Sequence, residues 1–133
     1  MKNGPLLQEM AFPFVRVAPR PSKPRKTGLT AFADRGLGMN QIADILETAG
    51  DYIDLVKLAV GMYRLQKESF LKRKIAAYHK AGIRVFTAGD VSEAAFMQGV
   101  SSRFLKELKK LGADGVEISS AQERNHPQRR LAI

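Results

Sequence analysis

The chain has 133 residues, of which 44% are hydrophobic and 26% are charged, a balance typical of a soluble domain that can bury a core. It contains no cysteine, which excludes disulfides, thiolate metal sites and a cysteine nucleophile and points to a reducing cytoplasm. No window approaches the ~20 apolar residues that a membrane helix needs, and residues 1–28 hold no apolar run of signal-peptide length. We therefore expect a cytoplasmic protein with no membrane partner.

The formal charge of +9 is concentrated at the two ends of the chain. Residues 1–27 hold six Lys or Arg against one Glu, and residues 122–133 hold three Arg against one Glu, whereas the body mixes both signs. No helix-turn-helix, zinc finger or aromatic RNA-binding motif accompanies this charge, which disfavours a nucleic-acid partner. Five prolines also fall in residues 1–27, so we predict a basic, proline-rich arm of extended backbone there.

The body, residues 28–133, alternates short apolar runs with longer amphipathic segments, the pattern of βα units around a parallel sheet. In chain order we predict a strand at 28–34 and a helix at 41–48 capped by Asn40, a strand at 52–60 and a helix at 70–81, a strand at 83–87 followed by a short helix near 93–96 and a helix at 101–111, and a strand at 115–119.

The glycines that end the predicted helices give the units a regular length. Gly50, Gly82 and Gly112 lie 32 and 30 residues apart, close to one βα unit, which favours a barrel or a doubly wound sheet. No GxGxxG opens the first helix, so the dinucleotide-binding alternative is weaker. The predicted fold class is α/β, of the TIM-type (β/α)₈ barrel family, here a half barrel of about four βα units.

Polar residues near the carboxyl ends of the predicted strands are the candidates for chemistry, because barrel enzymes build their sites there. Period-two alternation places Lys57 with Leu55 and Glu117 with Ser119, and places Asp54 on the opposite face of its strand. We expect Asp34, Lys57 and Glu117 to share the interior. Two carboxylates and one ammonium there could hold a divalent cation and an anionic substrate. Asp34 as a turn residue and Lys57 as a solvated side chain remain the alternatives.

Several sequence blocks together resemble the N-terminal half of the phosphosulfolactate synthase family. The blocks stand in the family's order and spacing and are KPRKTGLT (23–30), DRGL (34–37), GDYIDLVKLAVG (50–61), KIAAYHKAGIRVF (74–86), FMQG (96–99) and FLKELKKLGADGVEIS (104–119).

This resemblance implies a (β/α)₈ fold and a Mg²⁺-dependent lyase-type synthase, which adds sulfite to phosphoenolpyruvate to give (2R)-phospho-3-sulfolactate, an opening step toward coenzyme M. It implies three sets of residues. The catalytic set is Lys57, Glu117 and Asp34; the substrate-binding set is Lys57, Gly61, Gly89, Glu93 and Ser119; the metal set is Asp34 and Glu117, with Asp54 as the alternative ligand.

The chain also departs from the family's pattern. Val60, Gly61 and Met62 replace a Trp-Gly-Thr segment, Ala88, Gly89 and Asp90 replace Gly-Gly-Thr, and Ser120 and Ala121 stand where an Asp-Gly or Asn-Gly pair is expected. A barrel of this kind needs about 250 residues, so the C-terminal half is missing from the pattern. Two predictions stay open: a homo-oligomer that closes the barrel around the enzyme site, and a non-catalytic paralogue acting as a scaffold or stress-related interaction protein.

Overall fold

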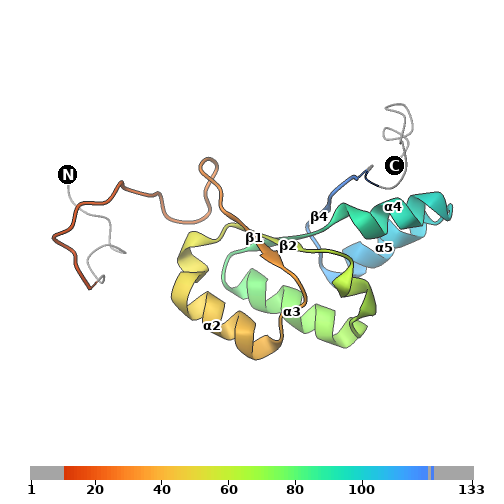
Figure 1. The fold of residues 1–133 in the computed structure, drawn as a ribbon, viewed down its shortest axis with the longest axis horizontal. Helices are drawn as coiled ribbons and strands as arrows, with labels where there is room; N and C mark the ends of the chain where they lie inside the picture. The colour runs from red at the N-terminus through yellow and green to blue at the C-terminus, as the bar shows by residue number, and fades with distance from the viewer. Residues whose placement is uncertain (1–10, 120, 122–133) are drawn as a thin grey trace.

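A computed structural model describes residues 11–119 and 121. Its strands form one parallel sheet in the order β1-β2-β3-β4, and the strands alternate with helices along the chain (Figure 1). The strands are β1 (Ala31–Asp34), β2 (Leu55–Leu58), β3 (Arg84–Thr87) and β4 (Gly115–Val116). The helices are α2 (Met39–Ala49), α3 (Glu68–Lys80), α4 (Gly89–Met97) and α5 (Ser101–Leu111), with 3₁₀ turns η1 (Gly50–Tyr52) and η2 (Met62–Leu65). The predicted α/β half barrel is confirmed.

The boundaries of several elements differ from the prediction, and β4 ends at Val116 rather than at Ser119. Helix α2 follows Gly38 rather than Asn40, and the Gly38 amide donates to Oε1 of Gln41 at 2.9 Å, which satisfies one free donor of the first turn. Strand β2 is shorter than residues 52–60, because Tyr52 belongs to η1 and the chain turns at Val60. Gly82 and Gly112 follow α3 and α5 in the left-handed region, at φ 68° and 95°, as expected for helix-ending glycines.

The hydrophobic core lies between the sheet and the helices. Figure 1 shows α2 and α3 on one side of β1 and β2, and α3 contacts both α2 and α5. The strand residues that point to this side are buried, including Val56 and Leu58 of β2 and Val85 of β3, and they pack with Ile42, Ile75 and Tyr78 of the helices. No helix in the described part of the chain is long and apolar enough to cross a membrane.

The opposite face of the sheet, here called the inner face, is open. Its residues alternate with the buried ones: Ala31, Ala33, Arg84 and Gly115 are exposed, and Leu55, Lys57 and Phe86 are half-buried. Parallel strands normally carry cover on both faces. The inner face is therefore the side on which a complete barrel would enclose its interior.

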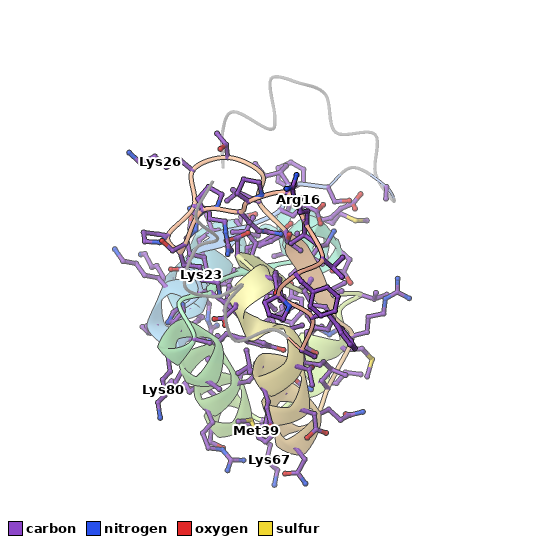
Figure 2. The ribbon with its side chains drawn as sticks, turned by 90° about the vertical axis from the view of Figure 1, so that its left-hand side faces the viewer. Arg16, Lys23, Lys26, Met39, Lys67 and Lys80 are labelled. Atoms are coloured by element: carbon purple, nitrogen blue, oxygen red, sulfur yellow. The ribbon has the colours of Figure 1, made fainter. Side chains whose placement is uncertain are left out.

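The basic arm is anchored to the amino end of the sheet. Residues 11–27 contain no helix or strand, as their prolines predicted, yet Arg20 and Arg25 both bind the carboxylate of Asp54, at 3.0 and 2.8 Å. Nζ of Lys23 donates to the carbonyls of Gly50 and Ala81 at 2.6 and 3.0 Å, at the ends of α2 and α3. Figure 2 shows Lys23 near these helices and Lys26 at the outer edge of the arm. Arg20, Lys23 and Arg25 of the basic arm thus contact the sheet and helix ends of the fold.

Candidate functional site

Lys57 and Glu117 form an ion pair at the carboxyl end of the sheet. Nζ of Lys57 lies 2.7 Å from Oε2 of Glu117, and both side chains are partly exposed on the inner face. Lys57 pairs in register with Phe86, which pairs with Gly115, so alternation along the last strand brings Glu117 to the same side. The predicted meeting of Lys57 and Glu117 is confirmed, while their chemical roles stay predictions.

Gly89, at the start of α4, packs closely against the segment that follows β4, next to the Lys57–Glu117 pair. Its amide donates to Oε2 of Glu117 at 3.1 Å. A Cβ at Gly89 would lie 2.5 Å from Cβ of Ser119, so no larger residue fits unless the segment that follows β4 moves. Oγ of Ser92 adds bonds to the carbonyls of Gly89 and Glu117, at 2.6 and 2.9 Å. The predicted residues Gly89 and Ser119 are therefore neighbours of the ion pair.

The Glu117 carboxylate is stabilised in its charged form. The hydrogen bond from Lys57 lowers its pKa most, burial opposes this, and the Gly89 amide and the Lys57 charge lower it further, so the pKa of Glu117 lies below its usual value. A depressed carboxyl pKa means that the stabilisation by this pair is present above the ordinary pKa and is lost as the pH falls through the lowered one. Near neutral pH, Glu117 is an anion.

A pocket of about 310 Å³ surrounds the ion pair. Its polar lining is supplied by Arg35, Lys57, Asp90, Glu117 and Ser119, with the backbone of Gly89. Arg35 and Asp90 were not predicted as site residues. Once Ala33 is known to lie on the inner side of β1, alternation leads from it to Arg35 two residues later, and Asp90 directly follows Gly89. The pocket combines two cationic and two anionic side chains.

The turn after β2 forms one wall of the pocket in an unusual conformation. Val60 has φ 58° and Gly61 has φ 64°, so two successive residues occupy the left-handed region. This region is unfavourable for a β-branched residue such as Val60. A Cβ at Gly61 would lie 2.5 Å from Oδ2 of Asp90, so Asp90 is seated directly against the turn. The predicted residue Gly61 lies on a neighbouring hollow that Val60 and Asp90 also line.

Asp34 lies on the other side of the sheet, so its predicted grouping with Lys57 and Glu117 is wrong. It is 1% exposed, and its Oδ2 lies 2.8 Å from Nζ of Lys74 and accepts a hydrogen bond from the Tyr78 hydroxyl at 3.0 Å. The physical reason is alternation: Asp34 is in register with Leu58, a residue of the helix-covered face, one place beyond the Lys57 position.

Asp54 and Glu93 also lie apart from the ion pair. Asp54 precedes β2 at the opposite end of the sheet, where Arg25 and Arg20 occupy its two oxygens, which contradicts its placement as an alternative metal ligand beside the other site residues. Glu93 is 2% exposed in α4 and is not part of the pocket lining. Its predicted role in substrate binding stays a prediction.

The carboxylates in the pocket are suitable ligands for the predicted Mg²⁺ ion. Residues 11–119 and 121 contain no group of three or more acidic or histidine side chains that could hold a metal by themselves. Mg²⁺, however, commonly uses one or two carboxylates together with water and substrate oxygens. Glu117 and Asp90 both line the pocket, and Oδ1 of Asp90 is buried and has no hydrogen-bond partner within the described residues.

The sequence is similar to proteins of a known family. The sequence model of a family described as (2R)-phospho-3-sulfolactate synthase (ComA) matches residues 18–132. A phosphosulfolactate synthase of Methanothermobacter thermautotrophicus is 31% identical over 110 residues, which cover 83% of this chain and 42% of that protein. A phosphosulfolactate synthase of Methanocaldococcus jannaschii is 40% identical over 92 residues, which cover 69% of this chain and 37% of that protein.

A plant relative carries a different description. Protein HEAT-STRESS-ASSOCIATED 32 of Arabidopsis thaliana is 34% identical over 108 residues, which cover 76% of this chain and 37% of that protein. The chain thus spans about two fifths of the length of the relatives that it matches.

Proposed function

Because this chain belongs to the (2R)-phospho-3-sulfolactate synthase family, we propose that it takes part in the addition of sulfite to phosphoenolpyruvate, giving (2R)-phospho-3-sulfolactate. The observation that carries the proposal is the Lys57–Glu117 pair at the carboxyl end of the parallel sheet, inside a pocket with a second cation, Arg35. Such strand ends are where barrel enzymes place their catalytic groups.

The proposed reaction forms one C–S bond and one C–H bond. Sulfite adds through its sulfur to the methylene carbon, C3, and the electron pair of the C2=C3 bond moves toward the carboxylate as an enediolate. A proton then forms the C2–H bond. Enzymes lower such barriers by placing positive charge where the negative charge develops.

Lys57 and Glu117 have distinct roles in this proposal. The ammonium of Lys57 faces the pocket, hydrogen-bonds the carboxylate on which the charge develops and donates the proton to C2, which it then regains from solvent. Glu117 is ionised, and it directs the Lys57 side chain into the pocket through the 2.7 Å ion pair. The Gly89 amide holds Glu117 in turn.

We include Mg²⁺ in the proposal with a changed set of ligands. Glu117 and Asp90 would hold it together with water and substrate oxygens, and it would supply further positive charge to the substrate carboxylate. Asp34 is left out of this set, because Lys74 and Tyr78 occupy its carboxylate on the other side of the sheet.

The test is formation of phosphosulfolactate from phosphoenolpyruvate, sulfite and Mg²⁺, followed by ³¹P NMR. We expect Lys57→Gln to lower the rate by about 10²-fold, which is a typical loss for an electrostatic group at a developing charge. Lys106→Gln changes an exposed lysine of α5 and should leave the rate unchanged. Absence of product from folded wild-type chain would refute the function, whereas product formation that is insensitive to Lys57 would refute only the residue assignment.

A second copy of the chain completes the proposed site. The inner face is open, and in the described sheet the outer strands β1 and β4 each have one neighbour, β2 and β3. Two copies would supply eight strands and cover both inner faces, and unpaired strand edges favour such pairing. We expect light scattering to give twice the chain mass of 14.7 kDa. A monomer that retains activity would contradict closure by dimerisation.

The plant relative supports a second candidate function. Its description concerns heat stress rather than a reaction, and it is similar over 76% of this chain. A non-catalytic role as a scaffold or stress-related interaction protein predicts a folded chain that forms no phosphosulfolactate. The same NMR assay therefore separates the two candidates.

A further inference from the structure

We propose that Arg35 is the group that binds the anionic end of the ligand in the Lys57–Glu117 pocket, through its planar guanidinium and an oxyanion of the phosphate or carboxylate class. The inference deepens the proposed function and names a residue that the family resemblance did not assign to the site. It rests on the charges of the pocket and on the way the backbone of Arg35 is held.

Arg35 is the pocket cation whose whole guanidinium is available to a ligand. The ammonium of Lys57 is shared with Glu117 at 2.7 Å. Arg35 lines the same pocket and is exposed, and within residues 11–119 and 121 it makes no ion pair or side-chain hydrogen bond. A guanidinium presents parallel N–H donors that match the two oxygens of a phosphate or carboxylate.

The backbone at Arg35 is anchored on both sides of its side chain. The amides of Gly36 and Leu37 both donate to Oδ1 of Asp34 at 2.8 Å, and the carbonyl of Asp34 accepts from the Ala59 amide at 2.7 Å. These bonds tie the turn after β1 to the end of β2, where the pocket wall begins. Asp34 itself is fixed by Lys74. Asp34 is thus a positioning residue, which directs Arg35 toward the pocket from behind the sheet.

The experiment measures binding and does not depend on turnover. Titration calorimetry of the full chain with phosphoenolpyruvate, inorganic phosphate and pyruvate, each added alone, gives three dissociation constants. We expect Arg35→Gln to weaken phosphoenolpyruvate binding about tenfold or more, as loss of a charge-assisted bidentate contact does. The affinity of Arg35→Lys for phosphoenolpyruvate should lie between those of the wild type and Arg35→Gln, because lysine keeps the positive charge but lacks the paired N–H donors of the guanidinium. Arg103→Gln, on an exposed arginine of α5, should bind like the wild type.

The three ligands show which oxyanion Arg35 binds. If inorganic phosphate loses affinity in Arg35→Gln and pyruvate does not, Arg35 binds the phosphate group; the reverse pattern assigns it to the carboxylate. Equal dissociation constants for wild type and Arg35→Gln with all three ligands would overturn the inference, as would absence of binding by the wild type. A chain that binds phosphoenolpyruvate through Arg35 but forms no product would refute the proposed reaction and leave this inference standing. Arg35→Lys serves as the readout if Arg35→Gln does not fold.

Discussion

Replacement of Asp54 by Ala is expected to lower the free energy of unfolding by about 3 kcal/mol, because it removes the partner of a buried cation. The side chain of Arg25 is 2% exposed, and its Nη1 lies 2.8 Å from Oδ1 of Asp54. Without the carboxylate, the guanidinium would keep its desolvation cost and lose its countercharge. Arg20 and the Thr30 amide would also lose their bonds to Oδ2 of Asp54, which are 3.0 and 2.8 Å long. Urea denaturation followed by circular dichroism measures the loss.

The matched control is Asp51→Ala, three residues earlier. Asp51 is exposed, and it contributes its backbone carbonyl, which the substitution retains, to Arg25. We expect a change within about 0.5 kcal/mol, as for most surface substitutions. Equal losses in the two variants would show that Asp54 does not anchor the arm.

The same contacts predict how the effect of Asp54 depends on pH. Burial acts to raise its pKa, but the hydrogen bonds from the Thr30 amide, Arg25 and Arg20, with the charge of Arg25, outweigh burial, so the pKa of Asp54 lies below its usual value. A carboxyl group with a lowered folded-state pKa stabilises the fold above its unfolded-state pKa and loses this contribution as the pH falls through the lowered value. The stability difference between wild type and Asp54→Ala should therefore shrink in acid.

Replacement of Lys74 by Met is expected to cost about 3–5 kcal/mol, the typical loss when one partner of a buried ion pair is removed. Lys74 and Asp34 are each 1% exposed, and Nζ of Lys74 lies 2.8 Å from Oδ2 of Asp34. The substitution leaves a buried carboxylate beside the Tyr78 hydroxyl, whose pKa is already raised by burial and by Asp34. Urea denaturation again gives the free energy of unfolding.

Lys72→Met is the control for this prediction, because it changes the same helix at a solvent-facing position. Lys72 pairs with Glu68 through side chains that are 50% and 70% exposed, and such pairs contribute about 0.3–0.5 kcal/mol. A second variant, Asp34→Asn combined with Lys74→Met, should recover part of the loss, since it removes the unpaired charge. A small effect of Lys74→Met alone would mean that Tyr78 and the turn amides suffice to stabilise Asp34.

The candidate site shows where alternation along a strand is informative and where it falls short. It brought Lys57 and Glu117 to one face correctly, because a period of two holds for any strand. In β1 a period of two places Asp34 on the same face as Phe32, and Phe32 packs against the core. The count alone did not say which of the two faces of β1 is the inner one. The small residues Ala31 and Ala33, not Phe32, proved to lie there.

The anchored arm shows a second kind of limit. Prolines predicted backbone without helix or strand in this segment, and that is local information. The bonds from Arg20, Lys23 and Arg25 to residues 50–54 and to Ala81 join positions 26 to 58 apart in the chain, so no local pattern reports them. Basic residues in a proline-rich tail have the same composition whether they are free or bound to a carboxylate and to helix ends.

The sequence by itself determined the order of the four βα units, the glycines that end two helices and the face shared by Lys57 and Glu117, because these depend on short-range periodicity and backbone preference. Only the tertiary structure decided that Asp34 pairs with Lys74 behind the sheet, that Asp54 receives the arginines of the arm, and that Arg35 reaches the pocket in place of Asp34. A buried charge takes whichever partner the packing of distant elements brings within bonding distance, and that choice is made in three dimensions.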